Sequence, residues 1–261
     1  MFSSLWIAKT GLDAQQASLD AIANNLANAN TTGYKTSRPA FQDLMYQNIT
    51  QPGSQTTEQN QSPSGLMMGT GVRIVGNEKV FTEGAISQTG NALDVAIQGR
   101  GFLQVGMPDG TTAYTRDGSL HTDANGQIVT ADGYPIQPAI TLPQGTQSIT
   151  IGNDGTVSAT VPGQATPVQL GVLQLADFIN PAGLQAMGQN LFLQTASSGT
   201  PQTGQAGLNG MGTLLQGALE SSNVNVVEAM VDMIQTQRVY EMNSKAISTA
   251  SSMLQAITNN V

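Results

Sequence analysis

Apolar residues recur at every seventh position near both ends of the chain. The repeat near the N-terminus consists of Leu5, Leu12, Leu19 and Leu26, with Ile22 beside it. The repeat near the C-terminus consists of Val226, Met233, Tyr240, Ile247 and Leu254, with Met230 beside it. This spacing is typical of helices that pack along a coiled-coil seam. It predicts one helix in residues 1–33, ending at Asn30 or Gly33, and a second in residues 222–261, from Val226 to about Asn259.

Neither predicted helix buries its apolar stripe alone, and most helical stability in proteins comes from burying such a face. The simplest arrangement pairs the two helices with each other, and then with the same pair in neighbouring copies. The two ends would then form a coiled-coil-like, tube-forming domain, and the residues of both repeats would be its polymerisation interface. Packing of both helices on the middle of the chain is the alternative.

The middle of the chain has the pattern of short strands joined by tight turns. The turn dipeptides are Asp109-Gly110, Asp117-Gly118, Asn125-Gly126, Asp132-Gly133 and Asp154-Gly155. Short alternating runs lie between them, which is typical of β-hairpins. We expect an all-β domain in residues 79–200, followed by a low-complexity return linker in residues 201–221. The fold class is therefore α+β, with the β domain inserted between the two helical ends.

Residues 34–78 are rich in glutamine and contain two turn signals. The residues that mark these turns are Pro52, Gly53, Pro63 and Gly65. Composition alone would indicate a linker, whereas paired turn signals between apolar clusters favour an extended arm or long hairpin. We expect the ordered arm, and we expect it to stiffen a polymer by reaching across to a neighbouring copy.

Composition narrows the possible partners. The chain of 261 residues has a formal net charge of −8, no cysteine and one histidine. Phosphate binding needs clustered lysine and arginine, so an acidic chain is a poor partner for nucleic acid. A disulfide framework and a thiolate metal site both need cysteine, and one histidine cannot form a two-histidine site within one chain. We expect no nucleic-acid partner and no metal.

The candidate catalytic motifs are incomplete. His121 lies among turn dipeptides, and no G-x-S-x-G motif is present. Residues 98–102 contain G-x-G without the third glycine of a dinucleotide loop, and residues 123–126 lack the remaining ligands of a calcium loop. A carboxylate pair of the glycosidase type is not excluded, so a secreted glycan-binding or glycan-cleaving β protein stays an alternative. We expect no enzyme activity, no catalytic residue and no cofactor.

Signals for membrane insertion or cleavage are not visible in the sequence. The N-terminal residues have no apolar core of a signal peptide, and no run approaches the roughly 18 apolar residues of a membrane span. We expect a chain that leaves the cytoplasm without a cleaved signal.

Motifs at both ends and in the middle resemble those of the bacterial flagellar rod and hook family. The N-terminal motif residues are Asn24, Asn25, Leu26, Asn28, Gly33 and Tyr34. The C-terminal motif residues are Ser222, Asn223 and Val224. Residues 98–102, 114–118 and 133–135 also match, so the resemblance covers nearly the whole chain. The opening residues 3–12, the chain length and the arm resemble the distal-rod branch of the family.

The resemblance implies a structural subunit of the flagellar basal body that polymerises helically, with terminal helices inside and β domains outside. A distal-rod subunit would join the proximal rod to the hook as a straight shaft and transmit motor torque. Its partners would be itself, proximal rod and hook subunits, the P- and L-ring proteins and the flagellar type III export apparatus. It would span from the periplasm to the outer membrane. A proximal rod or hook subunit is the nearer alternative.

Overall fold

The structure, a computed structural model, describes residues 2–54, 63–163 and 166–259. The chain forms two compact units, and each unit combines segments that are far apart in the sequence. The helical unit comprises Met1–Leu26, Ser37–Glu78 and Val226–Val261. The β unit comprises Ala27–Thr36 and Lys79–Asn225.

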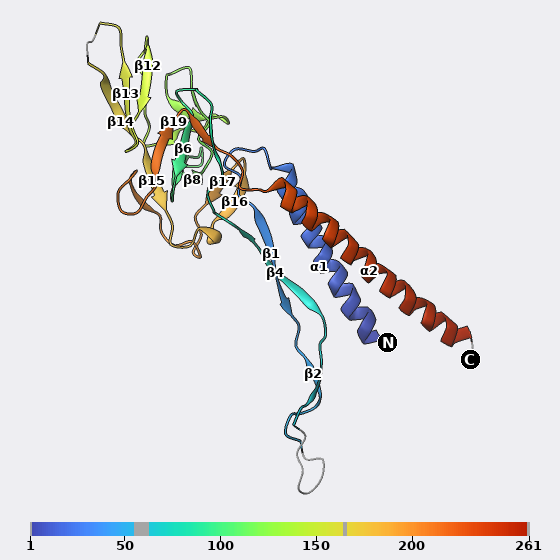
Figure 1. Ribbon diagram of the computed structural model, residues 1–261. Coiled ribbons are helices and arrows are strands. Elements are labelled where there is room, and N and C mark those ends of the chain that lie inside the picture. The colour runs from blue at the N-terminus through green and yellow to red at the C-terminus, as the bar shows by residue number, and fades with distance from the viewer. Residues whose placement is uncertain (1, 55–62, 164–165, 260–261) are drawn as a thin grey trace. The chain divides into compact units, whose positions relative to one another are not determined.

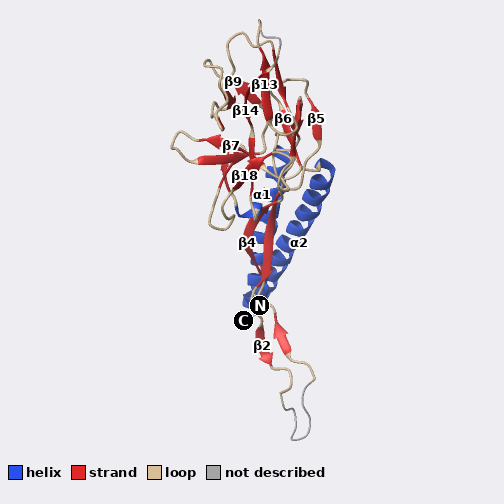
Figure 2. Ribbon diagram, turned by 90° about the vertical axis from the view of Figure 1, so that its left-hand side faces the viewer, coloured by secondary structure: helices blue, strands red, loops and turns tan. Residues whose placement is uncertain are grey.

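The two helices of the helical unit are antiparallel, with both chain ends at the same end of the unit (Figures 1 and 2). They are α1 (Phe2–Ala27) and α2 (Val226–Asn259). A Cβ atom added at Gly11 would lie 3.4 Å from Nδ2 of Asn243, so the two helices touch at this point. The bounds of α2 are those that the heptad repeat predicts, whereas α1 ends before the predicted Asn30 or Gly33.

Local hydrogen bonds accompany the early end of α1. The side chain of Asn25 donates to the carbonyl oxygen of Ser37 at 2.8 Å and accepts from its N–H at 2.9 Å. The N–H of Thr31 then donates to the carbonyl oxygen of Asn28 at 3.1 Å, which closes a turn. Asparagine binds nearby backbone more readily than it supports a helix interior. Gly33 has a φ of +66°, as a left-handed residue should, but it lies in the turn beyond the helix.

The remainder of the helical unit is an extended two-stranded arm. In it, β1 (Ser37–Asp43) pairs with β4 (Val72–Lys79), and β2 (Gln47–Thr50) pairs antiparallel with β3 (Leu66–Met68). Residues 55–62 of the expected arm lie outside the described residues.

The β unit consists of short strands and one turn of 3-10 helix. They are β5 (Ile86–Gln88), β6 (Val95–Gln98), β7 (Phe102–Gly106), β8 (Thr112–Thr115), β9 (Leu120–Thr122), β10 (Ile128–Thr130), β11 (Ile136–Gln137), β12 (Ser148–Ile151), β13 (Thr156–Thr160), β14 (Val168–Val172), β15 (Gln174–Asp177), η1 (Pro181–Gly183), β16 (Gln185–Gly188), β17 (Leu191–Leu193), β18 (Gln202–Gln205), β19 (Thr213–Gln216) and β20 (Ala218–Glu220).

The largest sheet has the order β16-β17-β8-β7-β15-β18, with β11 also paired to β7. A separate sheet has the order β12-β13-β14, and β9 pairs with β10. Residues 201–221 differ from the expected return linker, because they carry three strands. These strands are β18 on β15, β19 on β6 and β20 on β5. Strands of three or four residues among glycine and glutamine are too short for an alternating pattern to stand out.

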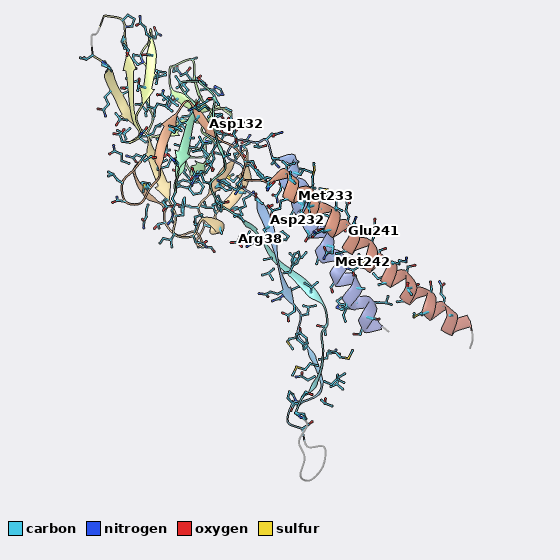
Figure 3. All side chains as sticks on the ribbon, in the orientation of Figure 1. Arg38, Asp132, Asp232, Met233, Glu241 and Met242 are labelled. Atoms are coloured by element: carbon cyan, nitrogen blue, oxygen red, sulfur yellow. The ribbon has the colours of Figure 1, made fainter. Side chains whose placement is uncertain are left out.

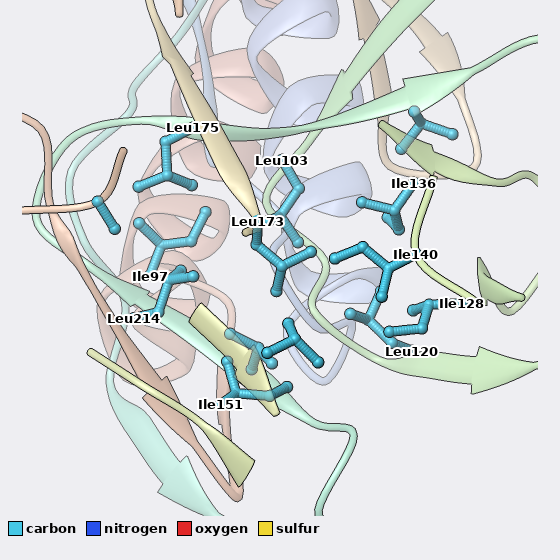
Figure 4. Close-up of a cluster of buried hydrophobic side chains, with 14 of the residues drawn as sticks. Ile97, Leu103, Leu120, Ile128, Ile136, Ile140, Ile151, Leu173, Leu175 and Leu214 are labelled. Atoms are coloured by element: carbon cyan, nitrogen blue, oxygen red, sulfur yellow. The ribbon is translucent and has the colours of Figure 1, made fainter. Parts of the chain in front are cut away.

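The core of the β unit draws on most of these strands. Ile97, Leu103, Leu120, Ile128 and Leu214 are each at most 1% exposed and belong to one cluster (Figure 4). A second, aromatic cluster lies beside the main sheet, with the rings of Tyr114 and Phe178 edge to face at 4.8 Å. Buried apolar area is the main favourable term in folding. The β unit therefore has the core that an independently stable domain needs.

Candidate functional site

The motif residues from both ends of the chain meet in the β unit. Gly33, Tyr34 and Lys35 are buried there, and so is Ser222. The N–H of Gly33 donates to the carbonyl oxygen of Glu220 at 2.8 Å. The segment that follows α1 and the segment that precedes α2 are thus held on the same β unit, at a junction that we call the chain-end junction (residues 27–36, 79–84, 116 and 218–225).

One side chain, Asn223, connects three parts of the chain-end junction. Its Oδ1 accepts from the N–H and the hydroxyl of Thr36, both at 2.7 Å. Its Nδ2 donates to the carbonyl oxygen of Val80 at 2.9 Å and to the hydroxyl of Thr82 at 2.9 Å. An amide is required here, because a single side chain must both accept and donate.

A buried charge cluster lies beside Asn223. The ammonium of Lys35 is 2.6 Å from Oε1 of Glu220, and both side chains are 0% exposed. Nη1 of Arg116 is 3.1 Å from Oε2 of the same carboxylate. Lys35 also donates to the carbonyl oxygen of Thr82 at 2.7 Å, and Arg116 to that of Gly99 at 2.6 Å. Burial lowers the pKa of Lys35, while its hydrogen bond to Glu220 opposes that shift.

Gly33 fits the chain-end junction only as glycine. Besides its positive φ, a Cβ atom there would lie 2.8 Å from the carbonyl carbon of Arg116 and from the nitrogen of Asp117. The neighbouring Thr32 is also held, because Asn190 donates to its carbonyl oxygen at 3.1 Å. The turn after α1 therefore lies directly against the backbone of the β unit.

The helical unit places other motif residues between α1 and the arm. Asn25 is buried against Ser37, as described above. Fifteen residues earlier, Thr10 Oγ1 accepts from the N–H of Val72 at 3.3 Å. Ala14 and Ala21 are 6% and 7% exposed, and they lie on the same helical face as Thr10 and Asn25. Small side chains along this face let the arm lie close to α1.

The expected interface residues differ in exposure. Leu5, Leu12, Leu19, Ile22, Leu26, Met233 and Ile247 are partly buried, whereas Val226, Met230 and Tyr240 are exposed. The side chain of Leu254 lies outside the described residues. On α2, Met233 is partly buried and Met242 is 62% exposed, although both belong to the same helix (Figure 3). The structure therefore gives partial burial along the seam within one chain.

A second apolar stripe on α2 is left exposed by the residues that the structure describes. It consists of Val227, Met230, Val231 and Ile234, which are 48–72% exposed. The spacing of three and four residues places these side chains on one face of the helix. We call this face the exposed α2 stripe. Of these four residues, the sequence pattern singled out only Met230, which stands beside the repeat that begins at Val226.

The arm also exposes large apolar side chains. They are Phe41, Met45, Tyr46, Ile49, Leu66, Met67, Met68, Ile74 and Val75. The arm's turn residues have different constraints: Gly53 has a φ of +83° in open space, whereas a Cβ atom at Gly65 would lie 2.5 Å from the carbonyl oxygen of Thr50. Pro52 also lies 2.7 Å from the site of a Cβ atom at Gly65, and Pro63 is exposed.

His121 and the turn carboxylates Asp109 and Asp154 lie in the β unit. His121 is exposed on β9, opposite Val129 of β10. Asp109 and Asp154 lie in separate turns, where hydrogen bonds from Thr111 and Thr156 lower the pKa of each carboxyl. In the described parts of the chain, no group of three His, Cys, Asp or Glu residues is placed to hold a metal ion. Neither described helix is long and apolar enough to cross a membrane.

Two members of the charge cluster lie at or inside motifs of the sequence, which give them no role. Lys35 directly follows Tyr34 of the N-terminal motif, and Arg116 lies in the run 114–118. Glu220 was missed, although it stands two residues before Ser222. No sequence motif includes Glu220, and its partner Lys35 lies 185 residues away, so the sequence pattern held no signal for this contact.

Three protein-family profiles match the chain. They are "Flagella basal body rod protein" at residues 5–35, "Flagellar hook protein FlgE/F/G D1 domain" at residues 96–159 and "Flagellar basal body rod FlgEFG protein C-terminal" at residues 215–260. Each matched region contributes one residue to the charge cluster: Lys35, Arg116 and Glu220, respectively.

Curated proteins are similar along almost the whole chain. The "Flagellar basal-body rod protein FlgG" of Buchnera aphidicola subsp. Schizaphis graminum is 52% identical over 258 residues, 99% of each chain. The protein of that name from Borreliella burgdorferi is 47% identical over 263 residues, covering 100% of this chain and 99% of the relative. The "Flagellar hook-basal body complex protein FlhP" of Bacillus subtilis is 33% identical over 273 residues, 99% of each chain.

Proposed function

This chain belongs to the family of flagellar basal-body rod proteins, and we propose that it polymerises through its helical unit into the straight shaft of the distal rod. Membership follows from relatives that are 52% and 47% identical along nearly the whole chain and carry the name of a basal-body rod protein. The relative named as a hook-basal body complex protein is less similar, at 33% identity. The assignment to the distal rod rests on the name that these relatives share and on the resemblance of the opening residues and the arm.

The observation that carries polymerisation is the uneven distribution of exposed apolar side chains. Among the described residues, all but three of the large apolar side chains that are exposed belong to the helical unit. The three exceptions are Ile179, Met187 and Leu208 in the β unit. A soluble monomer rarely exposes a large contiguous apolar patch, so such a surface indicates an interface.

The occupant of that surface is a further copy of the same chain. The exposed α2 stripe and the half-buried seam lie on a helix with a seven-residue apolar repeat, which suits packing against other helices with the same repeat. A surface that is complementary to another part of the same molecule and does not close into a ring generates a helical filament. The arm, with its exposed apolar side chains, adds a second contact between copies.

The proposal includes the setting of the polymer. The subunit would contact proximal rod and hook subunits at the ends of the shaft and the P- and L-ring proteins around it. It would reach the periplasm and outer membrane through the flagellar type III export apparatus, without a cleaved signal. Its role is structural, with torque transmission in place of catalysis. These details rest on family membership and on the resemblance of the end motifs.

Substitution of Ile234 by glutamate tests polymerisation through α2. Ile234 is 51% exposed on the exposed α2 stripe, so the single subunit should tolerate the change, whereas an interface would bury the carboxylate without a partner. We expect folded monomer with normal circular dichroism and no filaments by sedimentation and electron microscopy. The matched control is Ile179→Glu in the β unit, where Ile179 is 79% exposed. The control should still polymerise.

Normal filaments from Ile234→Glu would reject the proposed interface. Loss of filaments in both variants would show that added charge alone prevents assembly, and would equally remove support for the stripe.

A further inference from the structure

The carboxylate of Glu220 is the one acid of the buried charge cluster, and it joins groups from three other segments. Its Oε1 accepts from Lys35 at 2.6 Å and from the N–H of Gly84 at 2.9 Å. Its Oε2 accepts from Arg116 at 3.1 Å. Lys35 and Glu220 are separated by 185 residues of sequence, so the contact forms only when distant segments have both reached the β unit.

The two cations do not depend on Glu220 equally. Arg116 has its own carbonyl acceptors in the β unit, at Gly99 O (2.6 Å) and Ile97 O (3.4 Å). Lys35 has one neutral acceptor, Thr82 O, at 2.7 Å. Without the carboxylate, the ammonium of Lys35 would be buried with that one acceptor and would be repelled by the Arg116 guanidinium. A buried charge left without its partner is strongly destabilising.

Glu220 loses less when Lys35 is removed than Lys35 loses when Glu220 is removed. If Lys35 is absent, Glu220 still has Arg116 and the N–H of Gly84 as partners. The segment that carries Glu220 is also tied to the β unit by neutral contacts, since β20 pairs with β5 and the N–H of Ser221 donates to Ala85 O at 2.8 Å. The dependence between the two side chains is therefore unequal, and Lys35 loses more.

We propose that Glu220 controls the docking of residues 27–36, the segment that follows α1, onto the β unit. This segment docks stably only after residues 218–221 are in place, so the connections to both helices become fixed in one late step. A chain is made from its N-terminus, so the segment after α1 is available long before Glu220. It stays undocked during that interval. This inference goes beyond the proposed function and does not depend on it.

Hydrogen exchange on the whole 261-residue chain, as monomer, tests the proposal with three amides. The N–H of Val80, bonded to Thr36 O at 2.8 Å, reports docking of residues 27–36. The N–H of Ser221 reports docking of the segment that carries Glu220. The N–H of Gly106, bonded to Pro135 O at 2.8 Å, reports the β unit itself.

Glu220→Gln should speed exchange at Val80 by about 100-fold or more, since it leaves the Lys35 ammonium buried without a carboxylate. Exchange at the Gly106 amide should be unchanged. Lys35→Met should change exchange at Ser221 by less than about 10-fold, because Glu220 keeps its other partners. In the double variant Lys35→Met with Glu220→Gln, no unpaired ammonium is left, so protection at Val80 should return by at least about 10-fold relative to Glu220→Gln alone.

The matched control is Asp177→Asn, which makes the same change of acid to amide in the half-exposed ion pair between Asp177 and Arg100. It should leave hydrogen exchange at the Val80 amide unchanged. Three outcomes would overturn the proposal. The first is normal protection of the Val80 amide in Glu220→Gln. The second is a loss of protection at Ser221 in Lys35→Met as large as the loss at Val80 in Glu220→Gln. The third is a double variant whose Val80 amide is no better protected than in Glu220→Gln alone. If Glu220→Gln does not fold, the double variant should still fold, and its failure would also overturn the proposal.

Discussion

At the scale of single residues, Gly33 has two separate reasons to be glycine. Its φ of +66° disfavours any side chain by about 1–2 kcal/mol. The carbonyl carbon of Arg116, 2.8 Å from the site of a Cβ atom, adds a steric reason. The two reasons can be separated, because Gly110 has a similar φ of +81° in open space.

We predict that Gly33→Ala lowers the free energy of unfolding of the β unit by about 2–4 kcal/mol, because strain and clash act together. Gly110→Ala should lower it by about 1 kcal/mol, from conformation alone. Urea unfolding of both variants measures the difference. Equal losses would show that the turn after α1 moves away from Arg116 at little cost.

Asn223 provides a second test at this scale. Aspartate has the same shape and keeps the acceptor for Thr36, but it cannot donate to Val80 O. We predict that Asn223→Asp destabilises the β unit by about 1–3 kcal/mol, since a carbonyl loses its donor and faces a negative charge. The control is Asn30→Asp, an exposed asparagine in the turn after α1, which should stay within about 0.5 kcal/mol of the parent. An equal effect of the two changes in urea unfolding would contradict the role of Asn223.

At the scale of elements, the sequence predicts some features well and others poorly, for physical reasons. The bounds of α2 follow from a seven-residue repeat that continues over many turns, which is a strong local signal. Near the end of α1 at Ala27, the side chain of Asn25 contacts Ser37, and no helical periodicity encodes that contact. The strands in residues 201–221 form by pairing with β15, β6 and β5, which are distant in sequence.

The candidate site divides in the same way. Motif resemblance singled out Gly33 and Asn223, but not the fact that the two residues belong to one junction. The charge cluster needs Lys35, Arg116 and Glu220 to come together from three regions, and a contact across 185 residues leaves no pattern in a single sequence. The exposed α2 stripe was missed in part because a strict heptad describes one seam, whereas this helix presents two apolar faces.

The small-residue face of α1 is an element-scale feature with a direct test. Ala21 is 7% exposed between the contacts made by Thr10 and Asn25 with the arm. We predict that Ala21→Leu destabilises the helical unit by about 1–3 kcal/mol, because the larger side chain would push the arm from the helix. The control is Ala23→Leu, which adds the same side chain at an exposed position of the same helix. Unfolding followed by helical circular dichroism measures both. Equal stability of the two variants would show that the arm does not rest on this face.

At the scale of the whole molecule, the two units carry different tasks. The β unit buries most of its large apolar side chains in its own core, whereas the helical unit exposes many of them on α2 and along the arm. A two-stranded ribbon is at best marginally stable in water, so the apolar side chains of the arm need cover from outside the chain. The β unit can thus fold without neighbours, whereas the helical unit presents apolar surface for contacts with them. This division suits a subunit that stays folded alone and becomes rigid in a polymer.

The geometry of the arm allows its outer part to be removed without disturbing its root. The N–H of Leu44 donates to Gly71 O at 2.9 Å, and the hydroxyl of Thr70 donates to Met45 O at 2.7 Å. The two strands are therefore adjacent at Met45 and Thr70. Replacing residues 46–69 with an Asn-Gly turn would close the hairpin there, since this dipeptide favours a two-residue turn. The contacts of Thr10 and Asn25 with the arm would remain.

We predict that this shortened subunit still folds and polymerises but forms curved or flexible filaments, because neighbouring copies would lose the contact that we propose for the arm. Electron microscopy of filament curvature measures the effect. A control that keeps the arm at full length with Ile49→Ser and Met67→Ser should also bend, since both side chains are exposed and only neighbours could cover them. Straight filaments from the shortened subunit would mean that α1 and α2 alone set the stiffness, and the arm would then need a different role.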